Sequence, residues 1–148
     1  MQDFVTVSKL TKKYGELTAV DNLSFTVKEG EIFGFLGPNG AGKSTTLNVL
    51  CTLTDYDKGD ITVGGHRLGR DERAVKALIG LVPQDIALYP TLTAAENVAF
   101  FASLYGLGGG RLRSAVEDAL GFVGLSGQAK KLAGKLSGGM QRRLNIAC

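Results

Sequence analysis

The 148-residue chain has the length of one domain, and its 44% hydrophobic and 21% charged residues are ordinary for a globular protein that buries a sizeable core. A formal net charge of +3 without a dominant basic block argues against nucleic acid as a partner. Two cysteines do not make a disulfide framework, so a reducing, cytoplasmic setting is expected. The sequence has neither a run of 18 apolar residues nor a signal-peptide pattern, so any role at a membrane is expected to come through a partner.

The N-terminal half reads as short strands with a helix between them. Alternating apolar and polar residues predict half-buried strands, and brief apolar runs predict buried ones. The second alternating segment follows the first closely and is expected to be antiparallel. The expected elements are strands over residues 4–10, 23–27, 31–36, 59–63 and 79–82, and a helix over residues 71–78.

The segment GPNGAGKST lies between the expected strand at residues 31–36 and a predicted helix over residues 44–50. It matches the pattern G-x4-G-K-[ST], which would arise by chance in well under ~1% of chains of this size. Glycines let successive N–H groups point at phosphate oxygens, and the helix N-terminus adds partial positive charge. Lys43 would contact the β- and γ-phosphates, and the Ser44 hydroxyl would bind Mg²⁺. The predicted nucleotide site comprises Gly37, Pro38, Asn39, Gly40, Ala41, Gly42, Lys43, Ser44 and Thr45.

The C-terminal half reads as helices over residues 94–105, 111–123 and 138–148. Thr93 and Glu96 form a capping-box pattern that marks the first helix start. The last helix follows the segment LSGGM, in which Ser137 is a favourable N-cap. Gly138 and Gly139 leave the first N–H groups of that helix uncovered.

Alone, LSGGM is an ordinary helix start. Ser137, however, follows Ser44 by 93 residues (137 − 44), and with this spacing the chain resembles the ATP-binding cassette (ABC) ATPase family, whose signature is LSGGQ. Met140 departs from that signature in the fifth place. Two further positions fit the family pattern. Tyr14 lies where the family has an aromatic ring that stacks on adenine, although a strand-end aromatic covering the sheet edge is the alternative. Gln84, in VPQD, matches the Q-loop glutamine that reaches toward Mg²⁺ and the attacking water.

The resemblance implies an α/β fold: a P-loop NTPase (ABC ATPase) core with an N-terminal antiparallel β subdomain and a helical subdomain, incomplete at the C-terminus. Residues 1–84 would form the β subdomain and P-loop core, and residues 85–148 the helical subdomain with the signature motif. The family's Walker B Asp, catalytic Glu and switch histidine are expected after Cys148, since the only histidine, His66, reads as a surface turn residue. The chain is therefore expected to bind ATP and Mg²⁺ without hydrolysing ATP alone.

The resemblance also implies partners. Ser137, Gly138 and Gly139 would cap the γ-phosphate bound by a second nucleotide-binding domain in a head-to-tail pair, coupled to integral membrane permease subunits at the inner face of the cell membrane. The segment from Leu81 to Leu107 is most similar to exporter-type cassettes. Two alternatives remain: a soluble ABC ATPase acting on ribosomes or DNA, and a P-loop kinase or GTPase, which would leave LSGGM unexplained.

Overall fold

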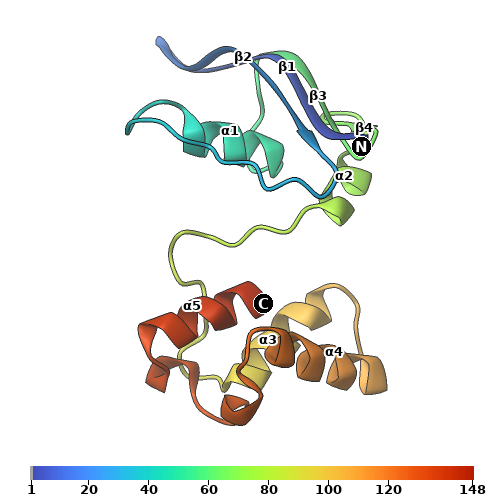
Figure 1. Ribbon diagram of the computed structural model, residues 1–148, viewed down its shortest axis with the longest axis vertical. Helices are drawn as coiled ribbons and strands as arrows, with labels where there is room; N and C mark the ends of the chain where they lie inside the picture. The colour runs from blue at the N-terminus through green and yellow to red at the C-terminus, as the bar shows by residue number, and fades with distance from the viewer. Residues whose placement is uncertain (1) are drawn as a thin grey trace. The chain divides into compact units, whose positions relative to one another are not determined.

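The structure is a computed structural model that describes residues 2–148, and these residues form two compact units. The first unit ends at Leu81, and the second covers Val82–Cys148. The first unit holds the strands and two helices, whereas the second is helical (Figure 1). Each unit has its own hydrophobic core.

The first unit is built on an antiparallel sheet with the strand order β2-β1-β3-β4. Alternating apolar and polar residues form the long strands β1 (Asp3–Tyr14) and β2 (Leu17–Lys28), which meet in a tight turn where Tyr14 pairs with Leu17. On the other side of β1 lies β3 (Lys58–Val63), followed by the two-residue strand β4 (His66–Arg67). The strands expected at residues 4–10, 23–27 and 59–63 are confirmed, as is the exposed position of His66.

Two helices pack against the buried side chains of this sheet. They are α1 (Lys43–Leu50) and α2 (Glu72–Leu78), both drawn on one side of the sheet in Figure 1. Each helix contributes one fully buried valine to the core, which is otherwise supplied by the strands and by Leu68. The buried residues of this core are Val7, Leu10, Val20, Val49, Ile61, Val63, Leu68 and Val75.

A glycine allows β1 and β3 to approach closely where β1 bends. The register shifts between Ser8 and Thr11, and Lys9 adopts a positive φ of 52°. Opposite this irregularity, Gly59 has φ of 110°, and a Cβ there would lie 2.7 Å from the carbonyl oxygens of Ser8 and Lys9. Only glycine fits this contact without moving the β1 backbone, so Gly59 belongs to the β-bulge.

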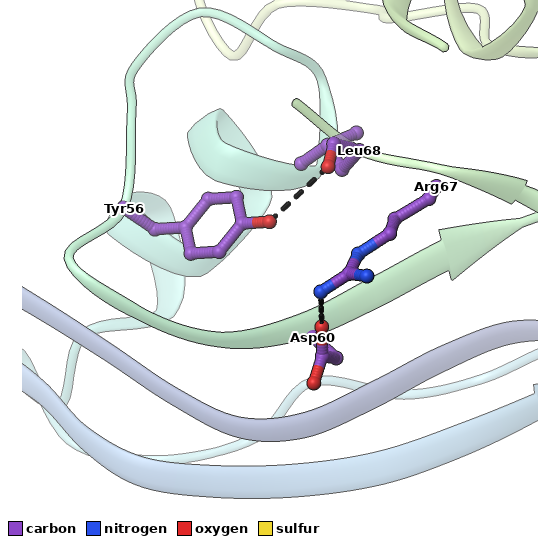
Figure 2. Close-up of polar contacts among 4 residues, drawn as sticks. All are labelled: Tyr56, Asp60, Arg67 and Leu68. Carbon is purple, nitrogen blue, oxygen red and sulfur yellow. Dashed lines mark hydrogen bonds and ion pairs between the residues drawn. The ribbon is translucent and has the colours of Figure 1, made fainter. Parts of the chain in front are cut away.

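Polar contacts close the β3–β4 hairpin (Figure 2). The Tyr56 hydroxyl donates a hydrogen bond of 3.2 Å to the carbonyl oxygen of Leu68, just after β4. Arg67 of β4 pairs with Asp60 of β3. Both charged side chains are more than half exposed, so solvent screens this pair and it adds little to stability.

Two expected strands are wrong. Residues 31–36 and 79–82 form no strand in the described part of the chain. Ile32 and Leu36 are almost fully exposed, while Phe33 and Phe35 contact the ring of Phe25 on β2, each with ring centroids 5.3 Å from it. A strand needs a hydrogen-bonding neighbour as well as an apolar sequence, and residues 2–148 pair no strand with either segment.

The second unit consists of α3 (Ala94–Leu104), α4 (Gly109–Phe122) and α5 (Gly138–Ala147), with two short 3₁₀ turns between α4 and α5, η1 (Ser126–Gln128) and η2 (Ala133–Lys135). All three expected helices are confirmed within two residues at each end, and so is the capping box of Thr93 and Glu96. The core of this unit comprises Ala94, Val98, Leu120, Val123, Leu125, Ala133, Leu136 and Leu144.

Candidate functional site

The glycine-rich loop of residues 37–42 leads directly into α1. Pro38 and Ala41 form a turn in which the Ala41 amide donates to the Pro38 carbonyl at 3.3 Å. Gly40 and Gly42 have φ of 83° and 80°, in the left-handed region that glycine adopts without strain. Since the residue before α1 is glycine, no side chain caps the first N–H groups of the helix. The loop therefore leaves a helix N-terminus free to bind an anion.

Gly42 also lies where no side chain fits. A Cβ at this position would be 2.4 Å from the carbonyl oxygen of Ala19 and 3.1 Å from a methyl group of Val20. The start of α1 is thus packed directly on β2. The buried Thr46 reinforces this start, because its hydroxyl donates to the Gly42 carbonyl at 2.9 Å.

Lys43 is the only charged residue between Glu31 and Asp55. Its ammonium donates hydrogen bonds of 2.6 Å to the carbonyl oxygens of Gly37 and Pro38, so the charge is held across the loop. The first turn of α1 contains no acidic side chain. Loop, helix end and lysine therefore combine into one positive, anion-accepting site, with the Ser44 side chain exposed beside it.

Tyr14 ends β1 and is half exposed, with the Lys12 ammonium 5.0 Å from its ring centroid. The register pairs Tyr14 with Leu17 and Lys12 with Val20, the residue that Gly42 touches. Leu17 and Val20 are three residues apart, or about 10 Å along the strand. The sheet therefore brings Tyr14 and the glycine-rich loop to the same end of β2. One face of the Tyr14 ring is available for stacking.

In the second unit, Ser137 caps α5, and its hydroxyl oxygen accepts a hydrogen bond of 3.3 Å from the Met140 amide. Ser137, Gly138 and Gly139 are all exposed, and a Cβ on either glycine would meet nothing within 4 Å. Leu136, just before them, is buried in the core. The expected N-cap is confirmed, and this second helix N-terminus is open to solvent.

Gln84 is exposed in an irregular segment at the start of the second unit. Its carbonyl oxygen accepts a hydrogen bond of 3.0 Å from Arg142 of α5. Asn145, also of α5, accepts the Ala87 amide at 3.1 Å, and Asn97 of α3 binds the backbone of Tyr89. Sequence reasoning missed these three residues. For the two asparagines the signal was a polar residue amid the apolar positions of a helix, with Asn97 before Val98 and Asn145 after Leu144, whereas Arg142 lies between two other polar residues and carried no such signal.

The two cysteines, Cys51 and Cys148, are free thiols. Burial raises the pKa of both, that of Cys148 to about 11. Protonated thiols are poor nucleophiles, so neither cysteine suits covalent chemistry at neutral pH.

Within residues 2–148, no three His, Cys, Asp or Glu side chains gather into a metal-binding group. No helix among these residues has both the length and the hydropathy to cross a lipid bilayer.

Residues 20–148 match the model of the ABC transporter family. The chain is 50% identical over 137 residues to the linearmycin resistance ATP-binding protein LnrL of Bacillus subtilis (strain 168), covering 93% of this chain and 44% of that protein. It is 44% identical over 139 residues to the Nod factor export ATP-binding protein I of Paraburkholderia xenovorans (strain LB400), covering 94% and 46%. The chain thus spans about half the length of the curated relatives it matches.

The fold agrees with these sequence matches. The solved structure of cbiO1 from Clostridium perfringens, described as part of the ABC transporter complex cbiONQ, superimposes with a TM-score of 0.88 at 27% sequence identity. That match covers 99% of this chain and 61% of cbiO1. The glycine-rich loop, the exposed start of the helix at Ser137 and the family match agree, and the chain belongs to the ABC transporter family.

Proposed function

We propose that this chain is the ATP-binding part of an ABC transporter subunit that uses ATP to drive export through partner membrane subunits. The observation that carries this proposal is the presence, in one chain, of two anion-accepting helix N-termini with different surroundings. The first lies beside Lys43 and the glycine-rich loop, and the second is capped by Ser137 and is exposed to solvent. Export is favoured because two relatives of this chain are named for linearmycin resistance and for Nod factor export.

In this proposal the loop residues 37–45 bind the triphosphate of ATP. Lys43 exchanges its two carbonyl partners for β- and γ-phosphate oxygens, while the backbone N–H groups at the start of α1 surround the phosphates. Tyr14 stacks on adenine, which its half-exposed ring and its position at the same end of β2 support.

The residues present fit a Mg²⁺ ion bound together with the nucleotide. Ser44 carries an exposed hydroxyl one residue after Lys43, and hard cations such as Mg²⁺ take oxygen ligands and phosphates. We assign Ser44 and Gln84 as its protein ligands, with Gln84 also orienting the attacking water. When bound, Mg²⁺ would supply positive charge that offsets the negative charge developing on the γ-phosphoryl group.

Ser137, Gly138 and Gly139 act in trans. Their exposure leaves them accessible to a ligand from outside their own unit, and we assign them to the γ-phosphate on a second nucleotide-binding domain in a head-to-tail pair. Residues 85–148 then form the helical subdomain that presents this motif. ATP closes the pair and hydrolysis opens it, which drives permease subunits between two access states at the inner face of the membrane.

Residues 1–148 by themselves are proposed to bind MgATP and to hydrolyse it at no measurable rate. Lys43, Ser44 and Gln84 supply binding, metal coordination and part of the water network, and none of these three residues is assigned as the general base. Loss of a general base removes about 10²–10⁴-fold in rate. A phosphate-release assay checks this, and turnover near ~1 s⁻¹ that disappears in Lys43→Ala would contradict it.

The function itself is tested by co-expressing the full-length protein with the products of its neighbouring genes, where the proposal predicts integral membrane proteins. The purified complex is expected to contain integral membrane subunits and to hydrolyse ATP faster in lipid than in their absence. A full-length protein that binds ATP, purifies without any membrane subunit and associates with ribosomes would overturn the transport proposal.

A further inference from the structure

Two side chains of α5 hold the backbone on both sides of Gln84. The Arg142 guanidinium donates through Nη1 to the carbonyl oxygens of Pro83 and Gln84, at 3.0 Å for Gln84. Asn145 Oδ1 accepts the amide hydrogen of Ala87 at 3.1 Å. Arg142 and Asn145 are three residues apart on one helix and therefore lie on the same face. They reach backbone groups that are 58 or 59 residues away in the chain.

The segment around Gln84 depends on these contacts. Residues 82–83 and 86–89 have no regular secondary structure, and residues 84–85 form only a bend, so no helix or strand ladder holds them. Asn145 is only 5% exposed, and its Nδ2 finds no hydrogen-bond partner among the described residues. A buried side-chain amide whose NH₂ group has no hydrogen-bond partner destabilises the fold. The hydrogen bond that Asn145 accepts from the Ala87 amide therefore explains why an asparagine occupies this position.

Helix α5 itself is firmly seated. Leu144, between Arg142 and Asn145, is fully buried, and Met140 packs on the same core. The helix begins at Gly138 after the Ser137 cap, and Ser137 precedes Arg142 by five residues, which is about 7.5 Å along a helix. One rigid element therefore joins the exposed Ser137–Gly139 backbone to the backbone of Gln84.

We propose that Arg142 and Asn145 are positioning residues that set the placement of Gln84 relative to the N-terminus of α5. This inference rests on the proposed function, in which Gln84 orients water and Ser137 contacts a γ-phosphate. Two arginine-to-carbonyl bonds fix the peptide groups on either side of the Gln84 Cα, so the direction in which its side chain leaves the backbone follows α5. The contact between Ser137 and a γ-phosphate and the orientation of the Gln84 side chain therefore both depend on helix α5.

The test uses the full-length protein with its membrane subunits, and it measures the Kd for ATP and the kcat and KM of hydrolysis. Arg142→Gln is expected to lower kcat about tenfold to a hundredfold with the Kd for ATP unchanged, since a misplacement of about 1 Å costs as much as 10²-fold. Arg142→Lys restores part of kcat, because an ammonium can still donate to one of the two carbonyls.

Arg143→Gln is the matched control. Arg143 also donates through Nη1 to a backbone carbonyl, that of Val123 at 2.9 Å, so its loss removes the same kind of bond from the same helix without touching the Gln84 segment. The control is expected to leave kcat unchanged. Equal losses of kcat in Arg142→Gln and Arg143→Gln would mean a general role in stability and would overturn the proposal.

A double-mutant cycle with Gln84→Ala separates positioning of Gln84 from other effects. If Arg142 acts through Gln84, Arg142→Gln lowers kcat no further in the Gln84→Ala background. A full additional loss would contradict the inference.

Hydrogen exchange gives a readout besides activity. The Ala87 amide is expected to exchange faster in Arg142→Gln and in Asn145→Leu than in Arg143→Gln. Unchanged exchange in both would overturn the structural basis. Failure of the wild-type protein to bind ATP would instead refute the proposed function, and the exchange result would stand separately.

Discussion

The Asn97 side chain and the Tyr89 backbone form a reciprocal pair of hydrogen bonds. Asn97 Oδ1 accepts the Tyr89 amide at 2.8 Å, and Nδ2 returns a bond of 3.0 Å to the Tyr89 carbonyl oxygen. Nδ2 also donates to the carbonyl oxygen of Thr93 at 3.0 Å. The Asn97 side chain, which is 0% exposed, thus makes hydrogen bonds to the irregular backbone before α3 that a neighbouring strand would otherwise make. The Asn97 side chain thus both accepts from and donates to the backbone, which no apolar side chain could do.

Asn97→Ala is expected to destabilise the protein by about 1–3 kcal/mol, because it leaves the Tyr89 amide without a partner, while the carbonyl oxygens of Tyr89 and Thr93 still accept the Leu92 and Asn97 amides. Chemical denaturation of the wild type and the variant measures the difference. Asn48→Ala, which removes an exposed asparagine from α1, serves as the control and should change stability little. Equal stability of Asn97→Ala and the wild type would contradict this account of the pair.

Lys43→Ala should weaken ATP and ADP binding together. The substitution removes a charge-assisted contact to phosphate, which is worth about 1.5–3 kcal/mol, or roughly tenfold to a hundredfold in affinity. Titration calorimetry with both nucleotides measures the effect. Lys76→Ala, at an exposed pair with Glu72 in the same unit, is the matched control and should bind normally. If Lys43→Ala bound both nucleotides with unchanged affinity, the glycine-rich loop would not be the phosphate-binding site.

Ser44→Ala should reduce the Mg²⁺ dependence of ATP binding and leave ATP binding in EDTA unchanged. The substitution removes a metal ligand but keeps the backbone N–H groups that surround the phosphates. Affinities measured with and without Mg²⁺ give the comparison. Ser114→Ala, on the exposed face of α4, controls for the loss of a serine hydroxyl. If Mg²⁺ strengthens ATP binding by the same factor in Ser44→Ala and in the wild type, Ser44 is not a ligand.

Tyr14→Phe should bind ATP as well as the wild type, while Tyr14→Ala should lose several-fold in affinity. Stacking of a base on an aromatic ring contributes about 1–3 kcal/mol and needs only the ring face. A fluorescent ATP analogue measures both variants, and Tyr105→Ala, at a highly exposed tyrosine of the helical unit, is the control. If Tyr14→Ala bound the analogue with wild-type affinity, the Tyr14 ring would not stack on adenine and would instead only cover the edge of the sheet.

Glu96 makes the capping box sensitive to acid. The hydrogen bond from the Thr93 amide, followed by that from the Thr93 hydroxyl, lowers the pKa of this carboxyl. A carboxyl with a lowered pKa in the folded state stabilises the fold above its unfolded pKa, and this contribution is lost as pH falls through the folded value. Glu96→Gln should therefore be less stable than the wild type at pH 7, with the difference shrinking below about pH 4.5, the ordinary glutamate value. Urea midpoints across this range check it, with Glu117→Gln on α4 as the control, and a constant difference would contradict it.

Local patterns were enough to predict much of this protein. The glycine-rich loop and the helix after it, the capping box at Thr93 and the N-cap at Ser137 each depend on residues within one or two turns of chain. Alternation along β1 and β2 likewise indicates which side chains face the core. Such features can be predicted because the interacting residues are close together in the sequence. Residue type and spacing are then enough to indicate the local structure.

The tertiary structure decided what depends on a distant partner. Residues 31–36 and 79–82 have strand-like composition, yet a strand exists only beside a hydrogen-bonded neighbour, and residues 2–148 place none beside them. The register that brings Tyr14 and Gly42 to one end of β2 follows from pairing between strands. Arg142 bonds to a carbonyl 58 residues away at Gln84, and no local pattern encodes a contact of that separation. Spacing thus predicted the glycine-rich loop and the helix after it, whereas only packing revealed that α5 holds the backbone of Gln84.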